Sequence, residues 1–148
     1  MFALCADSTA MTYMADPGFE ANDILNALQR QQDESRMLQS LGRFMAVEFH
    51  PKSLPLPGGG VMEIDGYSAK GNALCNVCSS EGTLTEDEEE LVLMNALKLN
   101  YVAQTLGNTV RQILLFRDPK VARAFCDSDR VQDAMQDSML EVCVLAPA

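Results

Sequence analysis

The cysteine pair in Cys75-Asn76-Val77-Cys78 is the arrangement in this chain that comes closest to metal or redox chemistry. Structural zinc takes four ligands, usually from two such pairs, and the sequence has no second pair. A thioredoxin-like pair needs its first cysteine at a helix N-terminus, whereas these residues fall in a predicted strand. Residues three apart in a strand point to opposite faces, which suits neither a shared metal nor a disulfide. We interpret Cys75 and Cys78 as structural thiols and keep a cysteine-based redox or metal protein as the less favoured alternative.

The other polar motifs do not assemble a catalytic set. His50 is the only histidine, so it would have to be the base of any Cys–His or Ser–His pair, and it has no local partner beside Pro51. The run Gly58-Gly59-Gly60 lacks the downstream Lys-Ser/Thr of a phosphate-binding loop. The acids from Glu86 to Glu90 occupy consecutive helical positions and point in different directions, unlike the ligands of a cation site. We therefore expect a protein that is not an enzyme and that needs no cofactor or metal.

Composition and charge narrow the class of partner. The chain has 148 residues, of which 47% are hydrophobic and 22% charged, as in ordinary globular domains. It has 21 acidic and 11 basic residues, a net charge of -10, which disfavours nucleic acid. The five cysteines are scattered, which disfavours a disulfide framework. The first basic residue is Arg30, so the N-terminal residues lack the positive region expected of a signal or transit peptide. No apolar run is long enough to span a membrane. These features predict a cytoplasmic protein whose partner offers basic or apolar segments.

The sequence predicts two regions along the chain. Residues 1–21 form a predicted loose N-terminal segment, and residues 22–148 form a single α+β domain. A helix over 22–41 begins at a capping Asn22 or Asp23 and is expected to stop at Gly42. The sequence leaves open three possible natural starts: Met1, Met11 and Met14.

Three short strands follow the predicted helix. Residues 44–49 alternate between two faces, as a strand does, and residues 51–60 form a proline- and glycine-rich connection. Residues 61–65 and 72–79 give a second and a third strand. Successive strands with short turns predict an antiparallel three-strand meander.

A long apolar helix is predicted over residues 86–106. Thr85 and Glu88 form a capping box at its start, and Gly107 is expected to end it. The apolar residues wrap much of its circumference, which indicates burial on more than one side. We therefore expect a two-fold homodimer with this helix in its interface, through Leu93, Leu97 and Tyr101.

The last third of the chain admits two interpretations. Residues 110–116 and 121–126 form a predicted hairpin, favoured slightly by the alternation in the second segment. The rival interpretation makes Asp118 an N-cap and Pro119 the first position of a helix. A terminal helix starting near residue 127 and reaching Val142 completes the expected order.

The assembled order resembles the class I type III secretion chaperones, the Tir-chaperone-like family. The likeness runs over residues 22–142. It is carried by a helix end that leads into a first strand (Leu38, Leu41, Gly42, Phe44 and Val47), by the second strand 61–65 before Gly66, and by Leu97, Leu99 and Asn100 at the end of the second long helix. The resemblance implies a homodimer that keeps the N-terminal segment of a bacterial effector extended, without using ATP. The resemblance therefore implies a chaperone that serves type III secretion and, through it, bacterial virulence.

Physical reasoning gives the same class of function by another route. An extended client protein can add to a sheet edge or place its side chains in apolar grooves beside a helix. The nine methionines suit either a permissive core or an adaptable binding surface. The main alternative is an immunity or antitoxin protein that neutralises a folded toxin. The residues expected to contact the client are Leu25, Leu28, Leu38, Leu41, Phe44 and Val47.

Overall fold

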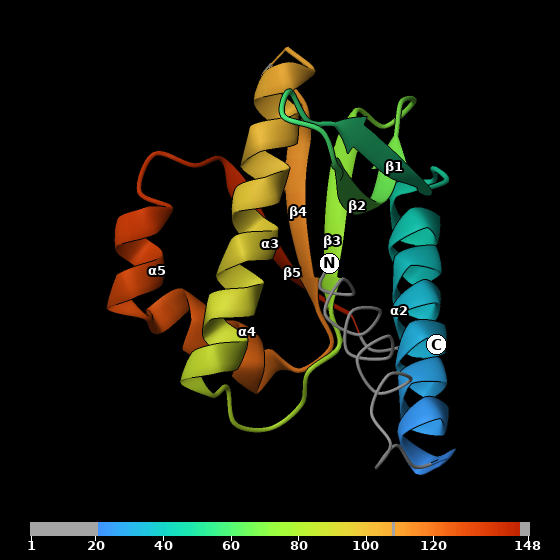
Figure 1. Cartoon of the computed structure of the whole chain (residues 1–148), viewed down its shortest axis with the longest axis vertical. Coiled ribbons are helices and arrows are strands. Elements are labelled where there is room, and N and C mark those ends of the chain that lie inside the picture. Colours follow the sequence, from blue (N-terminus) through green and yellow to red (C-terminus); the bar gives the residue numbers. More distant parts are fainter. Residues whose placement is uncertain (1–20, 108, 146–148) are drawn as a thin grey trace.

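The computed structural model describes residues 21–107 and 109–145, which form a five-stranded mixed sheet with helices on both faces (Figure 1). The sheet order is β1-β2-β3-β4-β5. The predicted loose segment 1–21 lies outside the described residues except for Ala21. The predicted α+β class is confirmed, with an N-terminal helix before a three-strand antiparallel meander. The elements are α2 (Ala21–Met45), β1 (His50–Pro55), β2 (Val61–Ser68), β3 (Ala73–Cys78), α3 (Glu86–Thr105), β4 (Arg111–Phe116), α4 (Pro119–Asp127), α5 (Asp129–Ala134) and β5 (Leu140–Val144).

Helix α2 is longer than predicted because Gly42 does not end it. The helix ends at Met45, and the next residue, Ala46, has a left-handed φ of 58°. The Val47 N–H donates to the Gly42 carbonyl at 2.9 Å and the Ala46 N–H donates to the Arg43 carbonyl at 3.3 Å, the pattern of a Schellman cap. A Cβ at Gly42 would lie 2.7 Å from the Val47 carbonyl oxygen, so this glycine allows the close return of the chain. The predicted strand over 44–49 is therefore wrong.

The antiparallel meander is confirmed, with different boundaries. Strand β1 begins at His50 and runs through part of the predicted connection 51–60 to Pro55. Strand β2 continues past Gly66 to Ser68, and β3 pairs antiparallel with it. A Cβ at Gly66 would lie 2.9 Å from Leu38, so α2 approaches β2 closely at this point.

Helix α3 is confirmed together with its capping box. The Glu88 N–H donates to the Thr85 hydroxyl oxygen at 3.2 Å, and the Thr85 N–H donates to the Glu88 carboxylate at 3.2 Å. The helix ends at Thr105, and Gly107 follows with a φ of 104°. The local sequence therefore determined both ends of this helix.

The predicted hairpin is wrong, and the helical alternative is correct. Strand β4 pairs parallel with β3, and α4 begins at Pro119 with Asp118 accepting the Lys120 N–H at 2.8 Å. Val121 and Phe125 are four residues apart and both buried, so they share one helical face. Over so few residues, the same spacing also fits a strand.

The predicted terminal helix is also mostly wrong. Helix α5 ends at Ala134, and Leu140–Val144 forms β5, which pairs parallel with β4. The connections β3-α3-β4 and β4-α4-α5-β5 are both parallel crossovers, which need a helix between the strands. Helices cover both faces of the sheet at these parallel strands. For this reason β3 is buried throughout and β4 is buried at all but its first residue.

The sheet separates two hydrophobic cores. One lies between the sheet and helices α3, α4 and α5, and includes Leu114, Phe116 and Phe125. The other lies between the sheet and α2, and includes Met37, Leu41, Ile113 and Leu115. Figure 1 shows α2 on the side of the sheet away from the other three helices.

Candidate binding groove

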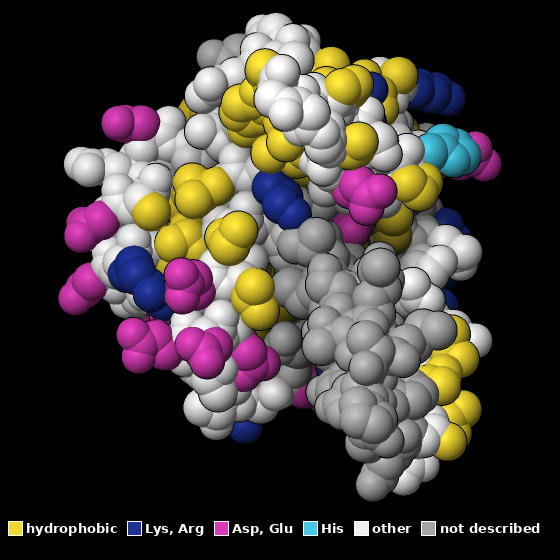
Figure 2. Space-filling model, in the orientation of Figure 1, with side chains coloured by type: hydrophobic (Ala, Val, Ile, Leu, Met, Phe, Trp, Pro, Cys, Tyr) yellow, Lys and Arg dark blue, Asp and Glu magenta, His cyan; other side chains and the backbone are white. Residues whose placement is uncertain are grey.

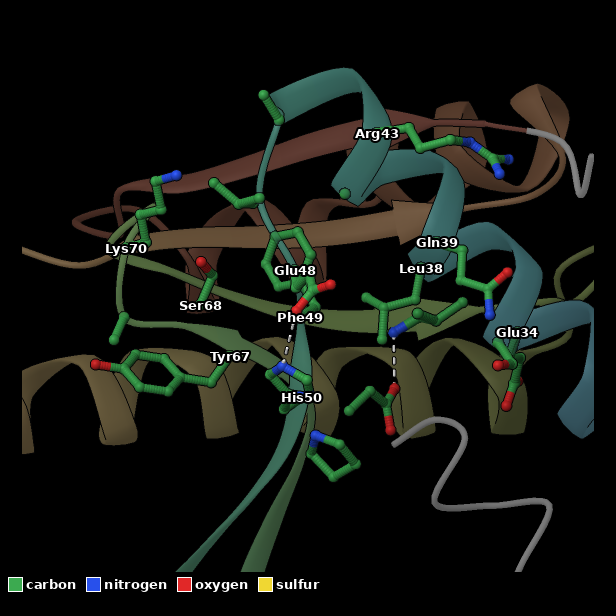
Figure 3. A pocket seen from close by; sticks show the side chains of 18 of the residues that line it. Glu34, Leu38, Gln39, Arg43, Glu48, Phe49, His50, Tyr67, Ser68 and Lys70 are labelled. Carbon is green, nitrogen blue, oxygen red and sulfur yellow. Dashed lines mark hydrogen bonds and ion pairs between the residues drawn. The ribbon is translucent and has the colours of Figure 1, made fainter.

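A groove with a volume of about 1150 Å³ opens between α2, the segment 46–51 and the end of β2. We call it the α2 groove. It exists because the Schellman cap turns the chain away from α2 at Ala46, and the extended residues that follow do not join the sheet until His50. Figure 3 shows side chains from the helix, the returning segment and β2 facing a common space.

Apolar side chains form part of the groove wall. Leu38, Val47 and Phe49 line the groove and are half-buried, and Leu38 and Phe49 also pack against the core under α2. Val47 lies close to the turn between β2 and β3, because a Cβ at Gly71 in that turn would be 3.1 Å from a methyl group of Val47. The wall therefore offers apolar contact from side chains that are already held in place.

Two carboxyl groups lie at one end of the groove. Glu34 is only 7% exposed, and its carboxyl accepts a hydrogen bond from the Ser79 hydroxyl at 2.8 Å. Asp65 is fixed by the sheet: its carboxylate accepts the Val77 N–H at 2.8 Å, and its own N–H donates to the Asn76 side-chain oxygen at 2.9 Å. Both residues line the groove.

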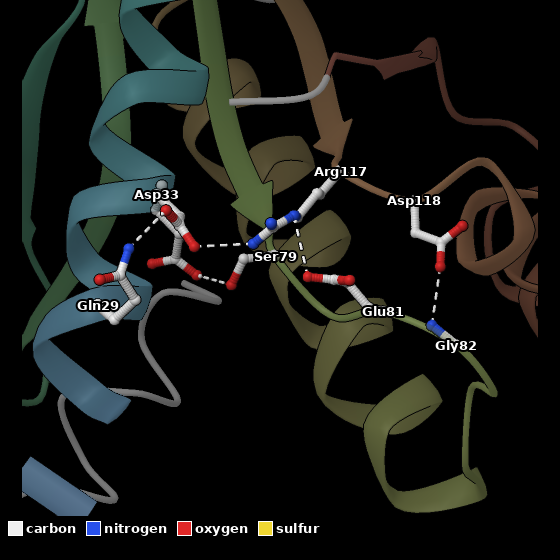
Figure 4. A network of polar contacts seen from close by, with 8 residues as sticks. Gln29, Asp33, Ser79, Glu81, Gly82, Arg117 and Asp118 are labelled. Carbon is white, nitrogen blue, oxygen red and sulfur yellow. Dashed lines mark hydrogen bonds and ion pairs between the residues drawn. The ribbon is translucent and has the colours of Figure 1, made fainter. Parts of the chain in front are cut away.

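The environment of Glu34 makes its carboxyl hard to ionise. Burial raises the pKa of Glu34 to about 8, the hydrogen bond from Ser79 opposes this shift, and the negative charge of Asp65 adds to it. Asp33, one residue earlier, has a different partner, because Arg117 Nη1 lies 2.7 Å from its carboxylate. Figure 4 shows this network at the end of β3, where Arg117 also contacts Glu81 at 3.1 Å.

Basic groups lie elsewhere along the groove. Figure 3 places Lys70 at the opposite end from Glu34. His50 is exposed and lies 3.6 Å from the Glu48 carboxylate. Arg43 is exposed, and its guanidinium donates to the Ser40 hydroxyl at 3.3 Å. Acidic and basic side chains therefore both line the α2 groove, with Glu34 and Lys70 at opposite ends (Figure 3) and Glu48 beside His50.

The structure places the six predicted client-contact residues in three different environments. Leu38 and Val47 line the α2 groove, whereas Leu41 is buried in the core. Leu25 and Leu28 are exposed on the first turns of α2, and Phe44 is 82% exposed; none of the three lines the groove.

Sequence reasoning missed Glu34 and Asp65. The polar run in the middle of α2 looks like a solvated helix face, and only the packing of α2 on the sheet buries one of its acids. Asp65 closes an alternating strand pattern, and its hydrogen bonds to β3 depend on the register between β2 and β3. No local signal in the sequence distinguishes these two acids from the other nineteen.

Helix α3 carries a second candidate surface. Between residues 91 and 101, every side chain that is exposed is apolar or aromatic. Figure 2 shows hydrophobic side chains along the line of α3 and acidic ones below, where the helix begins. Of the predicted dimer residues, Leu97 and Tyr101 lie on this surface and Leu93 packs into the core. We call this surface the α3 face; it consists of Leu91, Met94, Leu97 and Tyr101.

The two cysteines of the Cys-x-x-Cys pair lie on opposite faces of β3. Cys75 packs under α2 and Cys78 packs under α3, so they cannot share a ligand. Burial raises the pKa of Cys78 to about 11 and also raises the pKa of Cys75. Within residues 21–107 and 109–145, no group of three or more His, Cys, Asp or Glu side chains could hold a metal ion. No helix in the same ranges is long and apolar enough to cross a membrane.

Comparisons with protein-family models, with curated proteins and with solved structures give no match to this chain.

Proposed function

We propose that this protein is a non-catalytic binding protein that holds an extended segment of a client protein in the α2 groove. The observation that carries this proposal is the groove itself, which is open, walled by half-buried apolar side chains and about 1150 Å³ in volume. That volume exceeds the range of about 300–1,000 Å³ that is common for small-molecule pockets. It suits a peptide segment better.

The edge of the sheet beside the groove is poorly suited to take up a client strand. Strand β1 is an end strand of the sheet and contains Pro51 and Pro55. Proline has no N–H to donate, and in edge strands it discourages pairing with a further strand. A client is therefore expected to bind through its side chains in the groove and not by extending the sheet.

The resemblance to class I type III secretion chaperones gives the proposal its specific form. In that form the client is the N-terminal segment of a secreted bacterial effector, and the chaperone keeps it extended in the cytoplasm. The order of α2, the meander and α3 agrees with the expected order, and the parallel strands β4 and β5 differ from it. The groove, and not the order of elements, is therefore the stronger support.

We further propose that two copies associate through the α3 face. An apolar stripe on an otherwise solvated helix face is typical of an interaction surface. An antiparallel arrangement would keep the acidic starts of the two helices, Glu86–Glu90, at opposite ends of the contact. Light scattering should give twice the 16.2 kDa chain mass, and Met94→Glu should return the protein to a single chain. A wild-type mass that stays at one chain across dilution contradicts the dimer.

The test of client binding starts from the native host. The tagged protein should co-purify with a client whose bound segment exchanges its amide hydrogens freely when alone and slowly in the complex. Val47→Glu should reduce capture at least about tenfold, because the groove wall would then hold a charge. Val61→Glu changes an exposed apolar residue at the start of β2, outside the groove, and serves as the matched control. A client that is folded and protected in both states would favour the immunity or antitoxin function.

A further inference from the structure

We infer that the outer edge of β5 pairs with the β5 edge of another copy of the chain, antiparallel and about a two-fold axis at Val142. This contact joins two sheets edge to edge. It is separate from the α2 groove and from the α3 face, and it does not rest on the proposed client function. It is carried by the difference between the two edges of the sheet and by the self-complementary pattern of β5.

The two edges of the sheet differ in their protection against pairing. Strand β1 contains Pro51, Lys52 and Pro55, and its register with β2 shifts between His50 and Lys52. Prolines, lysines and bulges are devices by which natural edge strands avoid pairing with other chains. Strand β5, Leu-Glu-Val-Cys-Val, has none of them and contains two valines, which favour extended backbone. Of the two edges, β5 is therefore the one suited to pairing.

The backbone groups of β5 that face outward belong to alternate residues. The Leu145 N–H donates to the Phe116 carbonyl of β4 at 2.9 Å, so positions 141, 143 and 145 face β4, whereas 140, 142 and 144 face away from it. The Leu140 N–H agrees with this, because it donates to Ser138 Oγ at 3.1 Å. Among the described residues, no strand lies beyond β5. The outward groups at 142 and 144 can therefore bond to another strand.

A second copy presents a matching edge. With the two-fold axis at Val142, this residue lies opposite its own copy and Leu140 lies opposite Val144, so outward-facing backbone groups meet outward-facing groups. The side chains of these three residues lie on the side of the sheet that faces α3 and α4, and both valines are exposed there. Pairing would bring apolar side chains opposite each other, and such cross-strand pairs stabilise a sheet.

The charge on β5 also fits this register. Glu141 is the one charged residue of β5, and its carboxylate is held by Arg111 of β4, with Nη2 at 2.7 Å and Nε at 2.9 Å. About an axis at Val142, Glu141 lies opposite Cys143 of the second copy. An axis at Glu141 would place two carboxylates opposite each other, which destabilises a strand pair. An axis at Cys143 would pair fewer of the outward-facing residues.

The contact is expected to be weaker than the one proposed for the α3 face. A single pair of short strands contributes little stability, and the net charge of -10 opposes the approach of another copy. The β5 contact should therefore form at higher protein concentration than the α3 contact, and added salt should strengthen it by screening the repulsion. Where both contacts form, the assembly holds more than two chains.

A disulfide tests the register. Glu141→Cys places a thiol opposite the native Cys143 of the second copy, in a pair whose Cα atoms lie about 4.5 Å apart, within the range that a disulfide spans. The full chain carries Cys5→Ser and Cys126→Ser as well and is oxidised at high protein concentration. A band of two chains is expected on a non-reducing denaturing gel, and adding Cys143→Ser should abolish it. The lost ion pair with Arg111 is exposed, so the variant should fold.

Two substitutions at Val142 test the backbone bonds. The N–H at this position faces away from β4, so Val142→Pro removes one donor from each copy and leaves the bonds between β4 and β5 in place. Val142→Thr keeps the N–H and a β-branched side chain. Both are made in the Met94→Glu chain, so that the α3 face does not contribute. In sedimentation equilibrium at raised salt, Val142→Pro should weaken association at least about tenfold, and Val142→Thr should change it much less.

The other outcomes overturn the inference. A disulfide band that persists with Cys143→Ser would come from random collisions, and a band that needs Cys143 alone would require a different register. If Glu141→Cys folds and gives no band, or if it does not fold and the two Val142 variants associate equally, β5 does not pair with itself. A disulfide from Glu141→Cys to a captured client, in place of a second copy, would assign the β5 edge to the client. None of these results changes the test of the α2 groove.

Discussion

The two faces of the sheet are covered in different ways. On one face, α3, α4 and α5 close over β3 and β4, and the side chains between them form a continuous apolar core. On the other face, α2 is the one helix among the described elements, and a groove with two carboxyl groups remains beside it. Complete coverage leaves no space between the helices and the sheet, whereas a single helix that ends early leaves an unfilled space next to the sheet. We therefore expect the first face to determine stability and the second to determine client binding.

The largest expected effect is on the face covered by three helices. Phe116 is fully buried, and its ring centroid lies 5.5 Å from that of Phe125. Phe116→Ala should lower the free energy of unfolding by about 3–5 kcal/mol, since it removes a buried ring and leaves a cavity. Leu38→Ala, on the half-buried groove wall, should cost clearly less. Urea denaturation measures both, and equal costs would show that the groove wall is part of the core.

The second prediction concerns the pH dependence that Glu34 gives to the α2 face. The unfolded chain loses the Glu34 proton near pH 4.5, and the folded chain keeps it until pH is about 8. The contribution of this group to stability is therefore greatest below pH 4.5, falls as pH rises toward 8 and is constant above that. The slope is at most about 1.4 kcal/mol per pH unit.

Glu34→Gln should remove this slope. The variant should gain stability relative to the wild type between pH 5 and pH 8, by a few kcal/mol at the upper end. Denaturation curves at several pH values measure the difference, with Glu90→Gln as an exposed control. If the stability difference between Glu34→Gln and the wild type does not change with pH, the pKa of Glu34 is not raised by folding. The two faces of the sheet would then not differ in the pH dependence that they give to stability.

The smallest effect is expected at the end of α2, where the groove begins. Ala46 adopts a left-handed φ of 58°, which is unfavourable for a residue with a Cβ. Ala46→Gly should raise the free energy of unfolding by about 0.5–1 kcal/mol, because glycine adopts this conformation without strain. Ala69→Gly lies in a turn without a positive φ and should instead lower it slightly. Thermal denaturation of the two variants compares them, and a loss of stability in both would argue against strain at Ala46.

Much of the fold follows from local patterns. The capping box at Thr85 and Glu88 fixes the start of α3 because both partners lie within one helical turn. The helix before the meander and the burial of Cys75 and Cys78 on opposite faces also follow from spacing, because the periods of helix and strand are properties of the backbone. These parts of the structure depend on residues that are close in the sequence.

Only the tertiary structure decided the direction of β4 and β5 and the existence of the α2 groove. Residues 121–125 fit a helix and a strand equally well by pattern, and the helix is selected because parallel pairing of β4 and then β5 requires a connection across the face of the sheet. Glu34 is one of many acids in the sequence and becomes a buried carboxyl only where α2 crosses β3 near Ser79. Burial depends on contacts between residues far apart in the chain, and a pattern read along the sequence does not contain those contacts.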